Sequence, residues 1–189
     1  MPYLNLATVR LCTESEGPGK RMAIWVQGCE RRCPSCCNVQ MQEVKRNIIV
    51  DTNDLIEIIK KTLYDEQIEG VSFIGGEPFI QAQGLAHVAE WCQNNGLSVL
   101  IFTGYLYEEI LKMNTSETIR LLEHTDLLID GPFIIEQYDM ERDWVGSTNQ
   151  RVLFLSDRYE SGREFERNTR SLEVLISDKD ILVNGWPFE

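Results

Sequence analysis

Hydrophobic residues along this chain occur in two spacings, which predict strands alternating with helices. Short, predominantly apolar runs, typical of strands that are buried on both faces, lie at residues 22–26, 71–74, 97–102 and 127–129. A further apolar run at residues 152–155 predicts one more strand. These runs are too short for helices, so we interpret them as the strands of a buried sheet.

Helices are predicted between the strands. Residues 52–63 place their apolar side chains on one helical face, and Thr52 or Asn53 is the expected N-cap. A second helix around residues 85–92 is expected to stop at Asn95-Gly96, which is a C-cap signal. Two more helices are expected at 106–113 and 116–124.

The repeated order of strand, helix and strand predicts an α/β fold with right-handed crossovers and parallel strands. Glycine-containing turns follow the four main strands, and in such a fold the carboxyl ends of the strands meet at one edge. The turns begin at residues 27, 75, 103 and 130. This convergence favours a partial (β/α) barrel with its active site at that edge.

The densest chemical signal is a CxxxCxxC triplet, Cys29, Cys33 and Cys36, which follows the first buried run. Structural zinc takes four protein ligands, and ordinary ferredoxin clusters also take four cysteines. A 4Fe-4S cluster that is held at only three corners leaves one iron open for a substrate or cofactor. The spacing alone is also compatible with a zinc loop completed by Cys37, Cys12 or a histidine.

The cysteine triplet and the Gly-Gly-Glu-Pro turn at residues 75–78 together resemble the radical S-adenosylmethionine (SAM) superfamily. The resemblance implies a 4Fe-4S cluster on the three cysteines, with the open iron binding the amino and carboxylate groups of SAM. Reduction of the cluster then cleaves SAM to methionine and a 5'-deoxyadenosyl radical, which abstracts a hydrogen atom. No catalytic side chain is expected beyond the cluster and SAM.

The expected SAM contacts lie on the turns. In the superfamily, glycines let the backbone approach the methionine moiety, and the adjoining acidic residue and backbone accept the SAM amino group. Here that segment consists of Gly75, Gly76, Glu77 and Pro78. Thr103 is a further candidate for the SAM pocket, although threonine before glycine is ordinary turn chemistry. Asp130 is a candidate for a cation or the SAM ribose, although an Asp-Gly-Pro turn also uses such a residue for local hydrogen bonds.

Further motifs resemble the activating proteins of anaerobic (class III) ribonucleotide reductase. They lie at residues 25–29, 102–105, 126–133 and 146–151. This narrower resemblance covers roughly residues 4–155, and it implies removal of a Cα hydrogen from a glycine in a large partner enzyme. Ser35 and Cys37 depart from it, because that family usually has glycine and histidine there. Cys37 is either a small reduced thiol or an alternative ligand.

Length and composition agree with one compact enzyme domain, because 189 residues with 43% hydrophobic content suffice for a proper core. No apolar run approaches the roughly 20 residues that cross a bilayer, and the first residues lack a charged signal-peptide opening. We therefore expect a cytoplasmic protein without a membrane partner. The grouped cysteines do not suit a secreted disulfide scaffold.

Charge is unevenly distributed. Residues 1–50 hold seven Lys or Arg and four Asp or Glu, and the remainder holds 11 and 26, so the net charges are +3 and -15. The acidic remainder argues against binding of nucleic acid. Basic residues near the triplet are expected to receive an acidic electron donor, a flavodoxin or a ferredoxin, or else are solvated loop charges. They are Arg31, Arg32, Lys20, Arg21, Lys45 and Arg46.

We divide the chain into a radical SAM core, residues 1–155, and a C-terminal extension, residues 156–189, packed on the same domain. Strand-like runs at 172–176 and 180–183, with turn signals at 177–179, predict a hairpin in the extension. Three roles are compatible with that hairpin, namely structural packing, recognition of the partner and covering of the barrel mouth.

The sequence therefore predicts a radical SAM activase of a glycyl-radical enzyme, with anaerobic ribonucleotide reductase as its target. A radical SAM enzyme that modifies a small molecule or a peptide is one alternative, because it shares every motif near the cluster. A zinc or electron-transfer module without catalysis is another, but it leaves the Gly-Gly-Glu-Pro turn unexplained.

Overall fold

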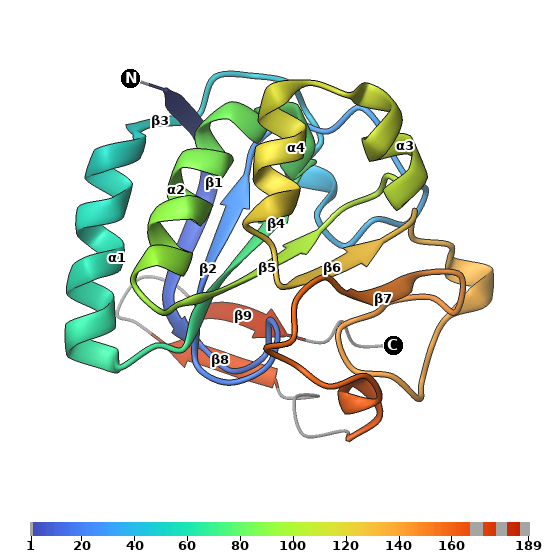
Figure 1. Cartoon of the computed structure of the whole chain (residues 1–189). Helices are drawn as coiled ribbons and strands as arrows, with labels where there is room; N and C mark the ends of the chain where they lie inside the picture. The colour runs from blue at the N-terminus through green and yellow to red at the C-terminus, as the bar shows by residue number, and fades with distance from the viewer. Residues whose placement is uncertain (1, 167–171, 177–180, 186–189) are drawn as a thin grey trace.

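The computed structural model describes residues 2–166, 172–176 and 181–185. A seven-stranded sheet runs through the molecule in the order β3-β1-β2-β4-β5-β6-β7 (Figure 1). The strands are β1 (Tyr3–Thr13), β2 (Arg21–Val26), β3 (Ile48–Asp51), β4 (Gly70–Gly75), β5 (Ser98–Phe102), β6 (Leu127–Asp130) and β7 (Arg151–Phe154).

The centre of the sheet is parallel, and both of its flanks are antiparallel. β2, β4, β5 and β6 pair in parallel, whereas β1 pairs antiparallel with β2 and β3, and β7 with β6. The predicted α/β fold with parallel strands is thus confirmed for the four central strands. Closure into a partial barrel stays a prediction, because the pairing leaves β3 and β7 as the edges of the sheet.

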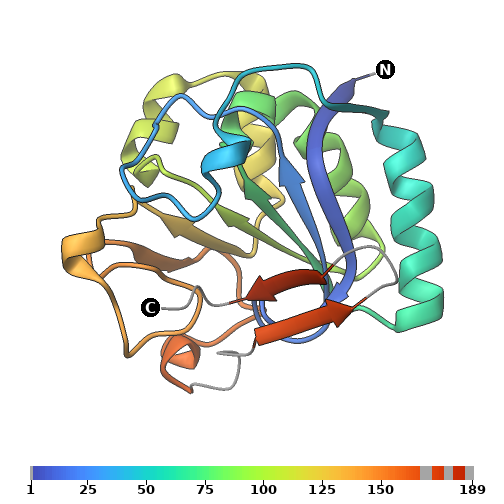
Figure 2. The same ribbon diagram turned by 180° about the vertical axis from the view of Figure 1, so that it is seen from behind.

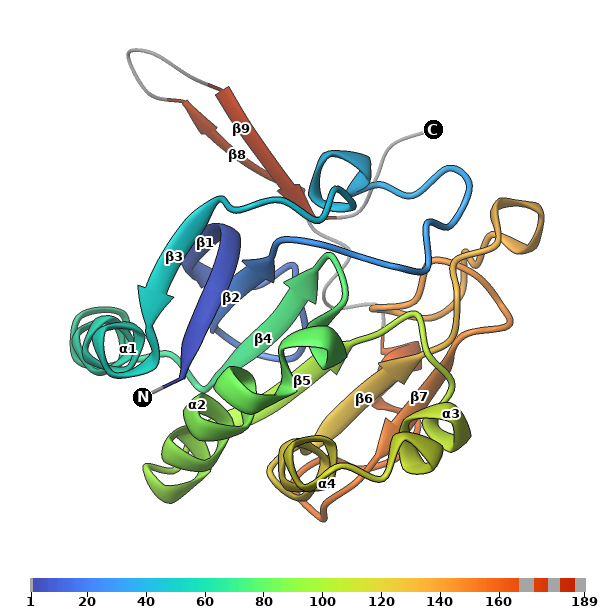
Figure 3. The same ribbon diagram turned by 90° about the horizontal axis from the view of Figure 1, so that it is seen from above.

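All four predicted helices are confirmed, and they cover one face of the sheet (Figure 3). They are α1 (Thr52–Glu66), α2 (Ala82–Asn94), α3 (Tyr107–Met113) and α4 (Ser116–Glu123). Among the residues that the structure describes, no helix combines the length and the apolarity needed to cross a bilayer.

The ends of the first two helices test the capping predictions. The N-cap of α1 is Asp51, whose carboxylate accepts a hydrogen bond from the Asn53 N–H at 2.8 Å. The predicted caps, Thr52 and Asn53, are wrong by one or two positions, because both residues already belong to the helix. The predicted end of α2 is confirmed, since Asn95 is its C-cap and Gly96 adopts the left-handed φ of 79°.

The core follows from the alternation of side chains along the central strands. In β2, Met22, Ile24 and Val26 pack on the helix side, whereas Ala23 and Trp25 belong to a separate cluster on the opposite face. All six residues of β2 are buried, as expected for a strand in the middle of a covered sheet. The opposite face therefore requires its own cover, which comes from loops and from the short 3-10 helix η1 (Val39–Met41), whose Met41 packs in that cluster (Figure 2).

The C-terminal extension contains the predicted hairpin, formed by β8 (Leu172–Ile176) and β9 (Ile181–Gly185). The predicted turn at 177–179 lies outside the described residues. Asn184 Nδ2 donates to Thr13 Oγ1 at 3.0 Å, and Glu173 Oε1 accepts from the Glu14 N–H at 2.8 Å. The hairpin thus contacts the turn between β1 and β2, at the end of β2 remote from Cys29. The domain boundary at residues 155 and 156 stays a prediction.

Candidate active site

A pocket of about 570 Å³ lies at the carboxyl ends of the parallel strands. Its walls come from the cysteine loop after β2, the turns after β4 and β5, and the segment after β6. Seven of the predicted site residues line it, namely Cys29, Cys33, Cys36, Gly75, Gly76, Glu77 and Thr103. Two further predicted site residues, Pro78 and Asp130, are described by the structure but do not line this pocket. The turns that the sequence analysis expected at one edge of the sheet therefore do meet there.

The cysteine loop is held by the segment that follows it. Gly28 N–H donates to Met41 O at 2.8 Å, and Cys29 N–H donates to Gln42 O at 3.0 Å. Cys29 is buried, Cys33 and Cys36 are half-buried, and Cys37 is exposed. Ser35 adopts a left-handed φ of 60°, which suits the glycine that the resembled family usually has at this position.

Hydrogen bonds favour the thiolate form of Cys36. The Cys37 thiol donates to Cys36, and the Asn38 N–H donates to Cys36 Sγ at 3.4 Å; together they lower the pKa of Cys36 to about 6. The bond between the two thiols raises the pKa of Cys37. Burial raises the pKa of Cys29. A thiolate is the form that ligates iron, so Cys36 is suited to that role.

Three cysteine sulfurs on one wall of the pocket fit a cluster, in which each thiolate binds a separate iron. Among the described residues, no group of three His, Cys, Asp or Glu side chains is arranged to hold a single metal ion. The three cysteines of the pocket supply thiolates, which are the donors that iron-sulfur clusters take, and so they fit the predicted 4Fe-4S cluster. The assignment of Cys29, Cys33 and Cys36 as its ligands stays a prediction.

Glu77 ties two turns of the pocket together. Its carboxylate is fully buried and accepts from the Phe79 N–H at 3.0 Å, the Thr103 hydroxyl at 2.8 Å and the Gly104 N–H at 2.9 Å. Burial raises the pKa of Glu77 to about 7, and these hydrogen bonds oppose the rise. Thr103 thus positions Glu77, whatever it contributes to a SAM pocket.

The structure gives the glycines of this turn a reason different from the expected approach of SAM. A Cβ on Gly76 would lie 2.0 Å from Gly28 O, and one on Gly75, whose φ is +106°, would lie 2.6 Å from Val26 N. In the same place Gly76 N–H donates to Val26 O and Glu77 N–H donates to Gly28 O, both at 2.8 Å. The glycines are therefore required for contact between the turn and the cysteine loop.

Asp130 is fully buried beside α3 and β7. Its carboxylate accepts from Arg151 Nε at 2.9 Å and from the Tyr107 N–H at 2.7 Å, and it forms an ion pair with Arg151 Nη2. These contacts cap the start of α3 and join β6 to β7. Both oxygens of the Asp130 carboxylate therefore have partners within the protein. The predicted contact of Asp130 with a cation or the SAM ribose stays a prediction.

Sequence analysis missed several lining residues, namely Gln42, Phe102, Phe133, Ile135 and Tyr138. Phe102 and Phe133 lie within the motifs at 102–105 and 126–133, but no role was assigned to them there. Gln42, Ile135 and Tyr138 lie outside every motif and come together only through the fold, so no signal in the sequence would have found them. Gln150, which belongs to the motif at residues 146–151, also lines the pocket. Its Oε1 accepts from the Gly146 N–H at 2.8 Å, and its Nε2 donates to Gly131 O at 3.1 Å.

The basic surface is smaller than predicted. Arg21 is fully buried at the opposite end of β2, where it donates to Ser72 Oγ and Ser98 Oγ at 2.7 Å each. Arg31 lines the pocket, pairs with Glu109 at 3.3 Å and lies 4.8 Å over the Tyr105 ring. The expectation that Arg21 belongs to a surface near the cluster is therefore wrong.

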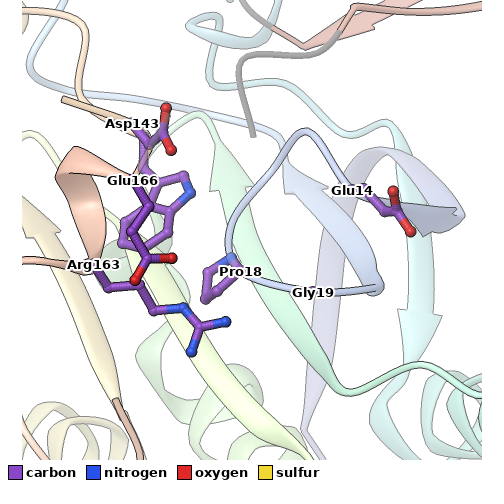
Figure 4. A pocket seen from close by; sticks show the side chains of 7 residues that line it. Glu14, Pro18, Gly19, Asp143, Arg163 and Glu166 are labelled. Atoms are coloured by element: carbon purple, nitrogen blue, oxygen red, sulfur yellow. The ribbon is translucent and has the colours of Figure 1, made fainter. Parts of the chain in front are cut away.

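A second pocket, of about 250 Å³, is lined by none of the predicted site residues. Figure 4 shows the carboxylates and the Arg163 guanidinium around it. Its lining residues are Glu14, Pro18, Gly19, Asp143, Trp144, Arg163 and Glu166.

Comparison with known families decides the class of the protein. A family described as "4Fe-4S single cluster domain" matches residues 15–153. The chain belongs to this family. The predicted 4Fe-4S cluster is thereby confirmed.

Named relatives are activating proteins. The chain is 31% identical over 152 residues to the anaerobic ribonucleoside-triphosphate reductase-activating protein of Vibrio cholerae, covering 72% of this chain and 88% of that protein. It is 24% identical over 153 residues to the protein of the same name from Enterobacteria phage T4, with coverages of 79% and 93%. It is also 32% identical over 120 residues to the pyruvate formate-lyase-activating enzyme of Clostridium pasteurianum, with coverages of 60% and 46%.

Among solved structures, QueE from Escherichia coli aligns with 54% of this chain and 53% of that chain, with a TM-score of 0.44 and 22% identity. That likeness is too limited to support an inference about function. Membership among the activating proteins confirms the prediction of a radical SAM enzyme that uses a 4Fe-4S cluster and SAM.

Proposed function

We propose that this protein installs a glycyl radical on an anaerobic ribonucleoside-triphosphate reductase. One observation carries the proposal beyond the relatives: the cysteine triplet, the Gly-Gly-Glu-Pro turn and the turn at Thr103 line one pocket. Cluster and SAM must touch for the reaction to begin, and a shared pocket meets that requirement. When bound, they supply reductive cleavage of SAM and a 5'-deoxyadenosyl radical that abstracts the hydrogen atom.

The residues of the pocket hold these groups in place. Cys29, Cys33 and Cys36 would hold the cluster on one wall, and the backbone of Gly76 and Glu77 would receive SAM on the adjoining wall. The Glu77 carboxylate is already occupied by three hydrogen bonds from the protein. We therefore assign it the role of fixing the turn, and we assign the contact with SAM to the backbone around it.

Apolar side chains complete the pocket. Ile74, Phe102, Phe133 and Ile135 line it beside the cysteines. Such a wall limits contact between water and the reacting atoms, which suppresses side reactions of a reactive intermediate. The pocket is open to solvent on one side, which gives a glycine loop of the partner a route to the reacting atoms.

Electron delivery requires a donor protein, for which we propose a flavodoxin or a ferredoxin. Arg32 and Arg46 are exposed near the cysteine loop and would attract an acidic donor. The ion pair between Lys45 and Glu43, at 2.6 Å, reduces the positive charge available beside them. The donor is therefore expected to bind weakly and with a strong dependence on salt.

The test has two stages. The protein is reconstituted anaerobically with iron and sulfide, reduced with dithionite in the presence of SAM, and assayed for 5'-deoxyadenosine. It is then mixed with an anaerobic ribonucleoside-triphosphate reductase or with a pyruvate formate-lyase, and the glycyl radical is measured by electron paramagnetic resonance. Cys36→Ala is the matched negative control.

Each outcome selects one hypothesis. A radical on the reductase supports the proposal, whereas a radical only on the lyase would move the assignment to the other class of relative. 5'-Deoxyadenosine without a radical on either partner favours a small-molecule or peptide substrate. No 5'-deoxyadenosine, with zinc retained in place of iron, would refute radical SAM chemistry.

A further inference from the structure

The cysteine loop carries two neighbouring arginines that lie in different surroundings. Arg32 is exposed, and within the described part of the chain it has no ion pair and no ring contact. Arg31 lines the pocket, and among the described residues it is the one cationic side chain that does so. Its side chain is 26% exposed. Arg31 stands between the predicted ligands Cys29 and Cys33, so whatever holds its side chain also holds the middle of the loop.

The side chain of Arg31 crosses from the cysteine loop to the segment after β5. Its Nη1 pairs with Glu109 Oε1 at 3.3 Å, and its guanidinium carbon lies 4.8 Å from the centroid of the Tyr105 ring. A Cβ on Gly104 would lie 3.1 Å from Arg31 Cγ, so the stem of the side chain passes close to that glycine. A guanidinium suits this position, because its flat face stacks on a ring while its edge donates to a carboxylate.

The groups that receive Arg31 are themselves fixed. Glu109 Oε2 accepts from the Leu106 N–H at 2.7 Å, at the start of α3. The Tyr105 N–H donates to Thr103 Oγ1 at 3.1 Å, inside the turn after β5. Arg31 therefore contacts a segment that is held by its own hydrogen bonds and does not follow a movement of the cysteine loop.

We propose that Arg31 is a positioning residue, which clamps the cysteine loop to the turn after β5 and so fixes the cluster relative to the turns that are expected to receive SAM. The base of the loop is held separately, by the hydrogen bonds of Gly28 and Cys29 to residues 41 and 42. Loss of the clamp should therefore leave the cluster bound but let it move relative to those turns. The proposal rests on the cofactors of the proposed function, and it is independent of the partner enzyme.

The effect on SAM follows from preorganisation of the loop. A partly exposed ion pair and a cation–ring contact are each modest, and together they should change the population of the clamped loop by roughly tenfold. SAM binds with full affinity only when the loop is in place, so its dissociation constant rises by the factor by which that population falls. Arg31→Met should therefore bind SAM about tenfold more weakly, which corresponds to about 1.4 kcal/mol.

The experiment measures iron content, and SAM affinity by equilibrium dialysis, on the full-length protein after anaerobic reconstitution. Arg32→Met is the matched control. No electron donor is present, so the expected part of Arg32 in donor binding does not enter the measurement. Both variants should keep iron near the wild-type content, and only Arg31→Met should lose affinity for SAM. Arg31→Lys keeps the charge and a donor, so it should lose less than about threefold in affinity.

Glu109→Gln separates the clamp from a direct attraction between Arg31 and the SAM carboxylate. The glutamine keeps an acceptor for the Leu106 N–H but removes the ion pair. The clamp predicts that SAM binds severalfold more weakly. A direct attraction predicts tighter binding, because the charge of Arg31 is then no longer offset. If Arg31→Met takes up no cluster, Glu109→Gln decides between the two by the same criterion.

Several results would overturn the proposal. Wild-type affinity for SAM in Arg31→Met would do so, as would an equal loss in Arg32→Met, and so would unchanged or tighter binding in Glu109→Gln. The unmodified protein is measured first. A wild-type protein that takes up the cluster but binds no SAM would refute the proposed function and this proposal with it, whereas SAM binding that is equal in wild type and Arg31→Met would refute the clamp alone.

Discussion

A methyl group added at Gly76 gives the sharpest test of how the pocket is built. In Gly76→Ala the new Cβ would lie 2.0 Å from Gly28 O and 2.7 Å from the carbonyl carbon of Gly28. Both are backbone atoms, so no side-chain rotation relieves the overlap. The turn and the cysteine loop must move apart, and Cys29 is the next residue in that loop.

Two contributions set the magnitude. Overpacking of a tight contact typically costs about 1–3 kcal/mol. Separation of the two segments also breaks the hydrogen bond from the Glu77 N–H to Gly28 O, now 2.8 Å long, at a cost of about 1 kcal/mol. Gly76→Ala should therefore lower the free energy of unfolding by about 2–4 kcal/mol.

The assay measures stability and cluster content in the same variants. Urea denaturation of the protein before reconstitution gives the free energy of unfolding, and iron and sulfide per chain after reconstitution give the cluster content. Gly104→Ala is the matched control in the same pocket. Its Cβ would meet Arg31 Cγ at 3.1 Å, a flexible side chain that gives way, so its cost should stay below about 1 kcal/mol.

Gly76→Ala is expected to lose both stability and iron, and Gly104→Ala to keep both. Unchanged stability and iron content in Gly76→Ala would refute the contact between turn and loop. If only the affinity for SAM fell, the glycine would serve the approach of the methionine moiety, as the sequence alone suggests.

Three further predictions concern single side chains. Alanine at any of the three triplet cysteines should abolish iron binding, whereas Cys37→Ala should retain it, as measured by iron content. Because burial raises the pKa of Glu77 from 4.5 to about 7, the folded protein binds the extra proton between these pH values. The free energy of unfolding should therefore fall by up to about 3 kcal/mol as pH rises through that window, and Glu77→Gln should remove the slope in urea titrations. Asp130→Asn should weaken the pair with Arg151 and turn an amide NH2 toward a donor, at a cost of about 1–3 kcal/mol, and leave SAM cleavage near the wild-type rate.

Local patterns predicted the buried strands and amphipathic helices well, because burial of one face imposes a spacing that the sequence displays. The same reasoning explains why β1 was not predicted. Leu4 and Leu6 are buried, but Val9 and Leu11 further along are 38% and 48% exposed, so the strand shows no uniform apolar run. Its pairing with β3 occupies only its first residues.

Errors at the site come from using distance in sequence as distance in space. Arg21 is eight residues from Cys29, but it is the first residue of β2, whereas Cys29 lies beyond the other end of that strand. Gln42 shows the reverse case. It is thirteen residues from Cys29 in the sequence, yet its carbonyl oxygen accepts from the Cys29 N–H at 3.0 Å. This contact forms because the chain after the cysteines folds back onto Cys29, and no sequence motif predicts such a return.

The cysteine triplet and the Gly-Gly-Glu-Pro turn form one structural unit. Gly28 O accepts from the Glu77 N–H, and the Glu77 carboxylate accepts in turn from Thr103 and Gly104. A displacement of the cysteine loop is therefore passed to the turn after β4 and then to the turn after β5. Because the ligands of the cluster and the expected contacts of SAM share these bonds, a substitution in either motif should disturb both cofactors.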